Sequence, residues 1–175
     1  MTDYSASKIC SFIATGLDTN LSTKARGDAL EDLICYLLEK LSGVQTRRNV
    51  VDRSKSCEVD VIVINCQHGW MAQYPKVFFV ECKNWGKPVD SKVLRDFAMK
   101  MEDRFVEVGV LVTANGITGD PAALTAAHQE IVIQQAKGRR IVVVNVDKLR
   151  TITMASEFEQ LLVDCFLTTV GLTRQ

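Results

Sequence analysis

The sequence predicts an α/β fold in which a mixed central sheet carries helices on both faces. Apolar residues recur at spacings of three and four within residues 22–41, a pattern typical of an amphipathic helix. Short runs rich in β-branched residues, the strongest at 59–64, predict strands. The predicted order is a helix, a three-stranded meander, and then helix, strand, helix, strand and helix. This order indicates a mixed sheet.

The first three strands are predicted to form the meander. Residues 44–51 are a weak, basic candidate strand, whereas 59–64 is almost wholly apolar. Residues 65–75 contain a glycine and a proline, which predicts a connection to a third strand at 76–83. Because neighbouring strands of a meander lie side by side, side chains distant in sequence can meet across them.

Helices and strands alternate after the meander. Asp90 or Ser91 can cap a helix that runs to about residue 104. Asp120 followed by Pro121 predicts the start of another helix, which runs to about residue 136. The remaining elements are strands at 106–113 and 141–144 and a closing helix at 157–169. The helix that ends at about residue 104 is expected to bury Val93, Leu94, Phe97, Met101 and Phe105.

The composition predicts one domain over residues 1–175, with a core at about 22–150 and flanking helices at both ends. At 175 residues and 47% hydrophobic content, the chain can build one sizeable core but not two. It carries 21 basic and 21 acidic residues. No global positive field therefore favours nucleic acid, and any such binding must be local.

Cysteine usage and the apolar runs favour a cytoplasmic protein. The six cysteines include no CxxC pair, which argues against a zinc ribbon and against a dense disulfide framework. The apolar patch at 9–14 is too short for a secretion signal or a membrane span. We therefore expect a soluble protein that makes no contact with a membrane.

The tripeptide Glu81-Cys82-Lys83 closes an apolar strand and places two charges there. Successive side chains of a strand alternate between its faces, so Glu81 and Lys83 share one face and Cys82 enters the opposite packing layer. A carboxylate can hold a hard divalent cation, and a nearby ammonium can stabilise negative charge on an attacked phosphate. This pair therefore indicates a metal-dependent phosphodiesterase, although a buried ion pair between Asp60 and Lys83 that closes a sheet edge is the alternative.

Two further carboxylates can converge on this pair. Asp60 interrupts an apolar strand, where a lone carboxylate is costly unless a cation or hydrogen bonds compensate it. Glu31 lies on the long helix that precedes the meander. Magnesium accepts two carboxylates, a backbone carbonyl and several waters. The expected ligands are Asp60, Glu81 and the Cys82 carbonyl, with Glu31 binding through water.

These residues resemble the PD-(D/E)xK nuclease superfamily, and in particular its Mrr-type restriction-endonuclease-like branch. The segment 26–31 resembles the glycine-containing entry to that branch's catalytic helix, and 58–61 resembles its second-strand motif. Residues 81–85 resemble the third motif, and 109–116 resembles the following strand and turn. The similarity spans roughly 24–119. Val59 stands where the superfamily's name has proline, a position that carries no chemistry.

The resemblance implies a restriction-endonuclease-like fold and DNA hydrolysis dependent on Mg²⁺, for which Mn²⁺ can substitute. It implies that Asp60 and Glu81 are metal ligands, that Lys83 is catalytic and that Glu31 is auxiliary. Glu58 shares a face with Asp60 and is the alternative ligand.

Residues around the motifs are candidates for nucleic-acid contact. Asn84 and Trp85 follow the third strand, although a tryptophan there also fits a core lid. Lys100 lies on the next helix and can reach the site or stay solvated. The basic cluster on the first hairpin can track phosphates or guard a sheet edge, and it comprises Arg47, Arg48, Arg53 and Lys55.

The function expected is a hydrolase, an endonuclease that cuts DNA by attack of activated water, in restriction or antiviral defence against foreign DNA. One site per chain and two strands to cut favour a homodimer. A specificity partner or activator also fits, because no separate sequence-reading domain is visible. The alternatives are a noncatalytic nucleic-acid-binding or assembly subunit, and a junction-resolving or RNA-directed nuclease.

Overall fold

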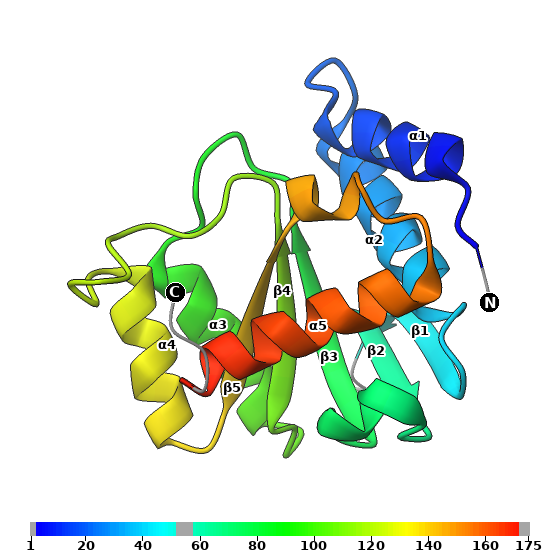
Figure 1. Cartoon of the computed structure of the whole chain (residues 1–175). Helices are drawn as coiled ribbons and strands as arrows, with labels where there is room; N and C mark the ends of the chain where they lie inside the picture. The colour runs from blue at the N-terminus through cyan, green and yellow to red at the C-terminus, as the bar shows by residue number, and fades with distance from the viewer. Residues whose placement is uncertain (1–2, 52–57, 172–175) are drawn as a thin grey trace.

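The computed structural model describes residues 3–51 and 58–171, which form a five-stranded sheet between two layers of helices (Figure 1). The strands lie in sequence order across the sheet. The first three strands pair antiparallel, the fourth pairs parallel with the third, and the fifth pairs parallel with the fourth. The mixed sheet predicted from the sequence is therefore confirmed. The strands are β1 (Val44–Val51), β2 (Glu58–Asn65), β3 (Val77–Lys83), β4 (Val108–Thr113) and β5 (Arg140–Asn145).

The helices divide between the two faces of the sheet. One face packs against α2 and α5, with α1 lying on α2, and the opposite face packs against α3 and α4 (Figure 1). The first and last helices of the described residues are α1 and α5. The elements are α1 (Ala6–Leu17), α2 (Thr23–Leu38), α3 (Ser91–Glu102), α4 (Ala127–Ala136), α5 (Ala155–Thr169) and the 3₁₀ helices η1 (Gly69–Gln73) and η2 (Val146–Leu149).

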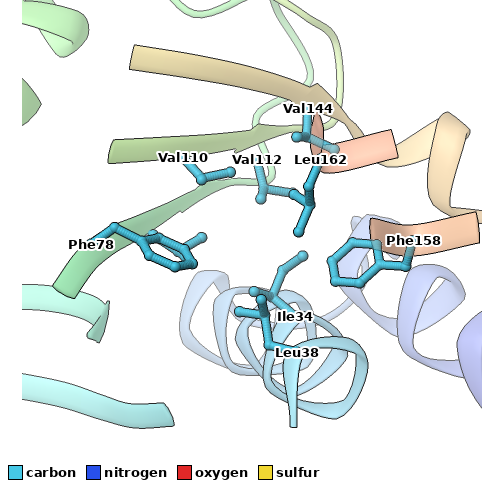
Figure 2. Close-up of a pocket in the computed structure, with 9 residues that line it drawn as sticks. Ile34, Leu38, Phe78, Val110, Val112, Val144, Phe158 and Leu162 are labelled. Carbon is cyan, nitrogen blue, oxygen red and sulfur yellow. The ribbon is translucent and has the colours of Figure 1, made fainter. Parts of the chain in front are cut away.

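The larger part of the core lies between the sheet and the pair α2 and α5. Ile34 from α2 and Phe158 from α5 face the sheet, and Phe78 of β3 lies among the side chains that meet them (Figure 2). All three are buried. This layer fixes α2 against β3, so it also fixes the helix that carries Glu31 relative to the strand that carries Glu81.

One predicted core residue is on the surface instead. Phe105 was expected on the buried side of α3, but its side chain is 96% exposed. The helix ends at Glu102, and Phe105 itself has a positive φ of 55°. The chain has therefore left the helical path before this residue, and the apolar spacing no longer decides which way it points. Leu94, Phe97 and Met101 are buried as predicted.

The two phenylalanines Phe78 and Phe105 give opposite expectations for stability. Phe78→Ala removes a fully buried ring and is expected to lower the free energy of unfolding by about 3–5 kcal/mol. Phe105→Ala is expected to change it by no more than about 0.5 kcal/mol, because the ring is already in water. Urea unfolding of the two variants checks both values, and a comparable loss in each would contradict this packing.

The helix expected from Asp120 begins later than predicted. Asp120 does accept hydrogen bonds through its carboxylate, from the amides of Ala122 and Ala123 at 2.8 and 3.3 Å. These close a local turn, and α4 starts only at Ala127. Leu124 and Ala126 have positive φ values, which a helix cannot accommodate. The Asp120-Pro121 pair therefore forms a turn before the helix, and the Asp120 carboxylate caps this turn and not α4.

Candidate active site

Glu81 and Lys83 lie on the same face of β3, as the alternation of strand side chains predicted. The Lys83 ammonium donates to Glu81 Oε1 at 2.7 Å, and Glu81 is only 4% exposed. Cys82 points into the other layer, with the core beneath α2 and α5. Burial raises the pKa of its thiol well above the usual range, so Cys82 is a packed neutral side chain.

Asp60 lies on β2 where the pairing with β3 gives way. The paired register runs from Ile64 opposite Val77 to Val61 opposite Val80. Beyond it, the Asp60 carboxylate accepts a hydrogen bond from the Cys82 amide at 2.8 Å. Asp60 thereby bridges to the strand segment that holds Glu81 and Lys83.

The Asp60 carboxylate is in an environment that disfavours its negative charge. Burial raises the pKa of Asp60, and repulsion from the Glu81 carboxylate raises it further. The hydrogen bond from the Cys82 amide and the ammonium groups of Lys83 and Lys100 act in the opposite direction without reversing the shift. Two carboxylates are therefore close enough to repel each other.

Lys83 keeps its charge in this setting. Burial alone lowers the pKa of Lys83, but the charge of Glu81, the hydrogen bond to Glu81 and the charge of Asp60 outweigh that effect. The pKa of Lys83 is raised overall. At neutral pH the side chain is therefore an ammonium, and its natural role is to stabilise negative charge.

Lys100 also reaches this cluster, from α3 on the same side of the sheet. Its ammonium donates to both oxygens of Glu81, at 2.8 and 2.9 Å. The approach of α3 depends on Gly109 of β4, because a Cβ there would lie 2.6 Å from the Phe97 ring and 2.7 Å from the Met101 sulfur. A glycine at this position lets the helix lie close to the strands.

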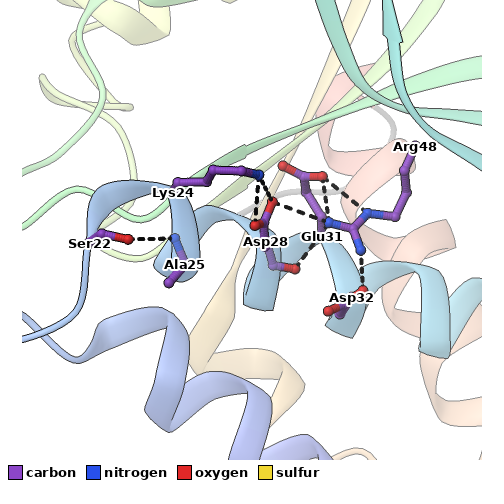
Figure 3. Close-up of polar contacts among 7 residues, drawn as sticks. All are labelled: Ser22, Lys24, Ala25, Asp28, Glu31, Asp32 and Arg48. Atoms are coloured by element: carbon purple, nitrogen blue, oxygen red, sulfur yellow. Dashed lines mark hydrogen bonds and ion pairs between the residues drawn. The ribbon is translucent and has the colours of Figure 1, made fainter.

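Glu31 of α2 is held by Arg48 of β1 (Figure 3). The guanidinium donates to Glu31 Oε2 through Nε at 3.2 Å and through Nη2 at 3.0 Å. It also pairs with Asp32 and lies 3.6 Å from Asp28. Burial raises the pKa of Glu31, the Arg48 hydrogen bond opposes this, and the charge of Asp60 adds to it. Glu31 and Asp60 are thus electrostatic neighbours.

The strength of this clamp can be measured. Arg48→Met is expected to lower the free energy of unfolding by about 1–3 kcal/mol, because it leaves the buried Glu31 carboxylate without its cation. Adding Glu31→Gln is expected to restore part of that loss. Arg47→Met is the matched control, since Arg47 is exposed on the same strand. Equal losses in the two arginine variants would contradict the clamp.

The other candidates for nucleic-acid contact occupy varied positions. Arg47 is exposed, and Trp85 is half-buried beside Lys87, whose ammonium lies 6.0 Å from the ring centre. Asn84 is only 7% exposed, and its side-chain Nδ2 has no hydrogen-bond partner among the described residues. The backbone carbonyl of Asn84 accepts from Arg26 at 2.7 Å. Arg53 and Lys55 lie outside the described residues.

The donor set suits a hard divalent cation. Asp60 and Glu81 offer carboxylate oxygens from adjacent strands, and their mutual repulsion is the condition that a cation relieves. Among residues 3–51 and 58–171, no group of three or more His, Cys, Asp or Glu side chains is arranged to hold a metal. A cation here would thus depend on few protein ligands, as Mg²⁺ does when it keeps several waters. Glu58, the alternative ligand, is exposed.

Comparison with known families agrees with this arrangement. The family model for the Mrr-type catalytic domain, described as restriction endonuclease, matches residues 23–153. The match covers most of the 175-residue chain. This protein belongs to the restriction endonuclease family. No curated protein sequence matches it at a significant level.

Membership of the restriction endonuclease family confirms the resemblance drawn from the motifs, and the sheet with its two helical layers is consistent with the restriction-endonuclease-like fold. Domains of this family generally use divalent metal ions. The matched range contains Glu31, Asp60, Glu81 and Lys83. No helix of the described residues is both long and apolar enough to pass through a bilayer.

Arg48 and Lys100 were both candidates from the sequence, but their partners in this cluster were not identified. Arg48 was considered as a phosphate contact, but its guanidinium is directed at α2. Asp28, Glu31 and Asp32 follow spacings of three and four, so they share one helical face, and that face requires a cation nearby. Such spacing was a usable signal. Nothing in the sequence pairs Lys100 with Glu81, because that contact depends on how closely α3 packs.

Proposed function

We propose that this protein is a Mg²⁺-dependent endonuclease that hydrolyses phosphodiester bonds of DNA by attack of activated water. The observation that carries the proposal is a geometric one: the Asp60 carboxylate accepts from the amide of Cys82, between Glu81 and Lys83, and the Lys83 ammonium donates to Glu81. Family membership supports the same class of chemistry. Asp60 and Glu81 are the proposed ligands, together with the Cys82 carbonyl and, through water, Glu31.

The proposed role of each residue follows from its charge. A Mg²⁺ ion held by Asp60 and Glu81 would supply Lewis-acid chemistry at a phosphate oxygen and would lower the pKa of water, and Mn²⁺ would supply the same chemistry. Lys83, kept as an ammonium by Glu81, stabilises the negative charge that grows on the attacked phosphate and orients the attacking water. Arg48 keeps the Glu31 carboxylate turned toward the sheet. Asp60 keeps Cys82 and its carbonyl in place through the amide hydrogen bond.

Contacts with DNA are proposed for the residues around this cluster. The exposed Arg47 can pair with a phosphate. A buried donor without a partner is costly, and the Nδ2 of Asn84 would gain one from substrate. Trp85 and Lys100 complete the proposed contacts, and Arg48 contributes only if it leaves its acidic partners.

The biological setting proposed is restriction or antiviral defence in the cytoplasm. A homodimer would place two sites on the two strands of a duplex. A further partner could supply sequence recognition or activation. The domain proposed for this activity spans residues 1–175, with its core at about 22–150.

A substrate panel tests the proposal. The purified protein is incubated with supercoiled plasmid, linear duplex, single-stranded DNA, branched DNA and RNA, each with Mg²⁺, Mn²⁺ or EDTA. Cutting of duplex DNA that requires metal is expected. Metal-independent cutting would contradict the mechanism. Preferential cutting of branched DNA or RNA would show that the substrate is one of these and not duplex DNA. Tight DNA binding without any cutting would instead favour a noncatalytic subunit.

A further inference from the structure

The Glu81 carboxylate is covered by two ammonium groups. Oε1 accepts from Lys83 at 2.7 Å and from Lys100 at 2.8 Å, while Oε2 accepts from Lys100 at 2.9 Å. Lys100 therefore contacts both oxygens and Lys83 only one. The carboxylate is 4% exposed, so little of its surface is left for another partner.

This arrangement conflicts with a ligand role for Glu81 unless a lysine moves. An ammonium and a divalent cation repel each other, and both seek the same lone pairs. Lys83 is two residues away on the same strand, which limits its range. Lys100 extends from α3, a separate element, and its side chain is 23% exposed. Of the two lysines, Lys100 is therefore better placed to leave Glu81 and turn toward solvent, so that a cation can bind Glu81.

The charges of the cluster support such an exchange. Asp60 and Glu81 carry two negative charges, and Lys83 and Lys100 carry two positive charges, so these four side chains balance one another. With a divalent cation added, the cluster has a surplus of about two positive charges. A phosphodiester attacked by hydroxide carries about two negative charges, so the loaded site complements that charge.

We propose that Lys100 is a second lysine of the active site, which occupies Glu81 in the metal-free protein and moves to a DNA phosphate when a divalent cation takes its place. This inference rests on the proposed function. It makes metal and DNA binding mutually reinforcing, since each favours the position of Lys100 that the other requires. Lys100 therefore weakens metal binding and strengthens DNA binding.

The decisive experiment measures Mn²⁺ affinity by calorimetry in the absence of DNA. Lys100→Met removes the competitor from Glu81, so Mn²⁺ is expected to bind about tenfold more tightly than in the wild type. The same substitution is expected to reduce DNA cleavage by about 100-fold. Mn²⁺ is also expected to strengthen DNA binding less in this variant than in the wild type. A purely structural role for Lys100 would not tighten metal binding.

Control variants separate charge from folding. Lys92→Met alters an exposed lysine of the same helix and is expected to leave Mn²⁺ affinity and cleavage unchanged. Lys100→Arg retains the positive charge and is expected to bind Mn²⁺ close to the wild-type affinity. Lys100→Gln provides a polar neutral variant, with thermal unfolding as the check on its fold, and is expected to follow Lys100→Met.

The outcomes distinguish this inference from the proposed function. Unchanged or weaker Mn²⁺ binding in both neutral variants would overturn the role of Lys100, even if the wild type cuts DNA with metal and Asp60→Ala does not. Absence of both metal binding and cleavage in the wild type would overturn the proposed function and this inference together. Tighter Mn²⁺ binding with reduced cleavage in the neutral variants would support it.

Discussion

Asp60→Asn is expected to reduce DNA cleavage by about 10³-fold or more, because it removes the charge of a proposed metal ligand, a loss expected to cost several kcal/mol of catalysis. The asparagine oxygen can still accept the hydrogen bond that the Cys82 amide gives to Asp60, so the strands should stay in place. Plasmid cleavage with Mg²⁺ measures the loss of activity, and calorimetry with Mn²⁺ measures the accompanying loss of metal affinity.

The same substitution is expected to stabilise the metal-free protein. Burial and the Glu81 charge raise the pKa of Asp60 in the folded state, so the folded protein holds this proton more tightly than the unfolded chain. The contribution of this proton on Asp60 to the free energy of unfolding is complete at low pH. It is lost as pH rises through the folded-state pKa of Asp60. The advantage of Asp60→Asn in urea unfolding should therefore grow from about pH 4 to about pH 7.

Glu58→Gln is the matched control, because Glu58 is an exposed carboxylate two residues away on the same strand. It should cut DNA normally and gain no stability. Loss of cleavage in Glu58→Gln together with full activity in Asp60→Asn would transfer the ligand role to Glu58. A destabilised Asp60→Asn variant would contradict the repulsion between the two carboxylates.

Lys83→Met is expected to reduce cleavage by about 10³-fold while DNA affinity changes little, because the proposed role of the Lys83 ammonium is to stabilise charge that develops during the reaction. Single-turnover cleavage at saturating protein isolates this effect from binding. Mn²⁺ binding should be retained, since Lys83 itself is no ligand.

Lys87→Met provides the comparison for Lys83→Met. Lys87 is exposed and lies near the Trp85 ring, so its loss can alter only DNA affinity. If Lys83→Met cut DNA at the wild-type rate once DNA was saturating, Lys83 would be a binding residue and not a catalytic one.

The strands of the site could be predicted because their signals are local. The β-branched run around Asp60 and the apolar run before Glu81 identify β2 and β3, and alternation places Glu81 and Lys83 on one face. A short connection between the two strands then brings Asp60 beside them. These inferences need only the period of a strand and the pairing of neighbours.

The remaining contacts depend on how closely a helix packs against a strand. Arg48 meets Glu31 because β1 lies against α2, and Lys100 meets Glu81 because Gly109 admits α3 close to the sheet. Phe105 followed the helical spacing but lies beyond the end of α3. Periodicity identifies the face of a helix, but neither its last residue nor its distance from a strand.

The position of a bound metal ion decides whether Asp60 and Glu81 are its ligands. A crystal soaked in Mn²⁺ and measured at the manganese absorption edge reveals the ion by its anomalous scattering. We expect a peak in direct contact with carboxylate oxygens of Asp60 and Glu81, with the Lys100 ammonium displaced from Glu81. A peak elsewhere, with the two lysines still bound to Glu81, would contradict it.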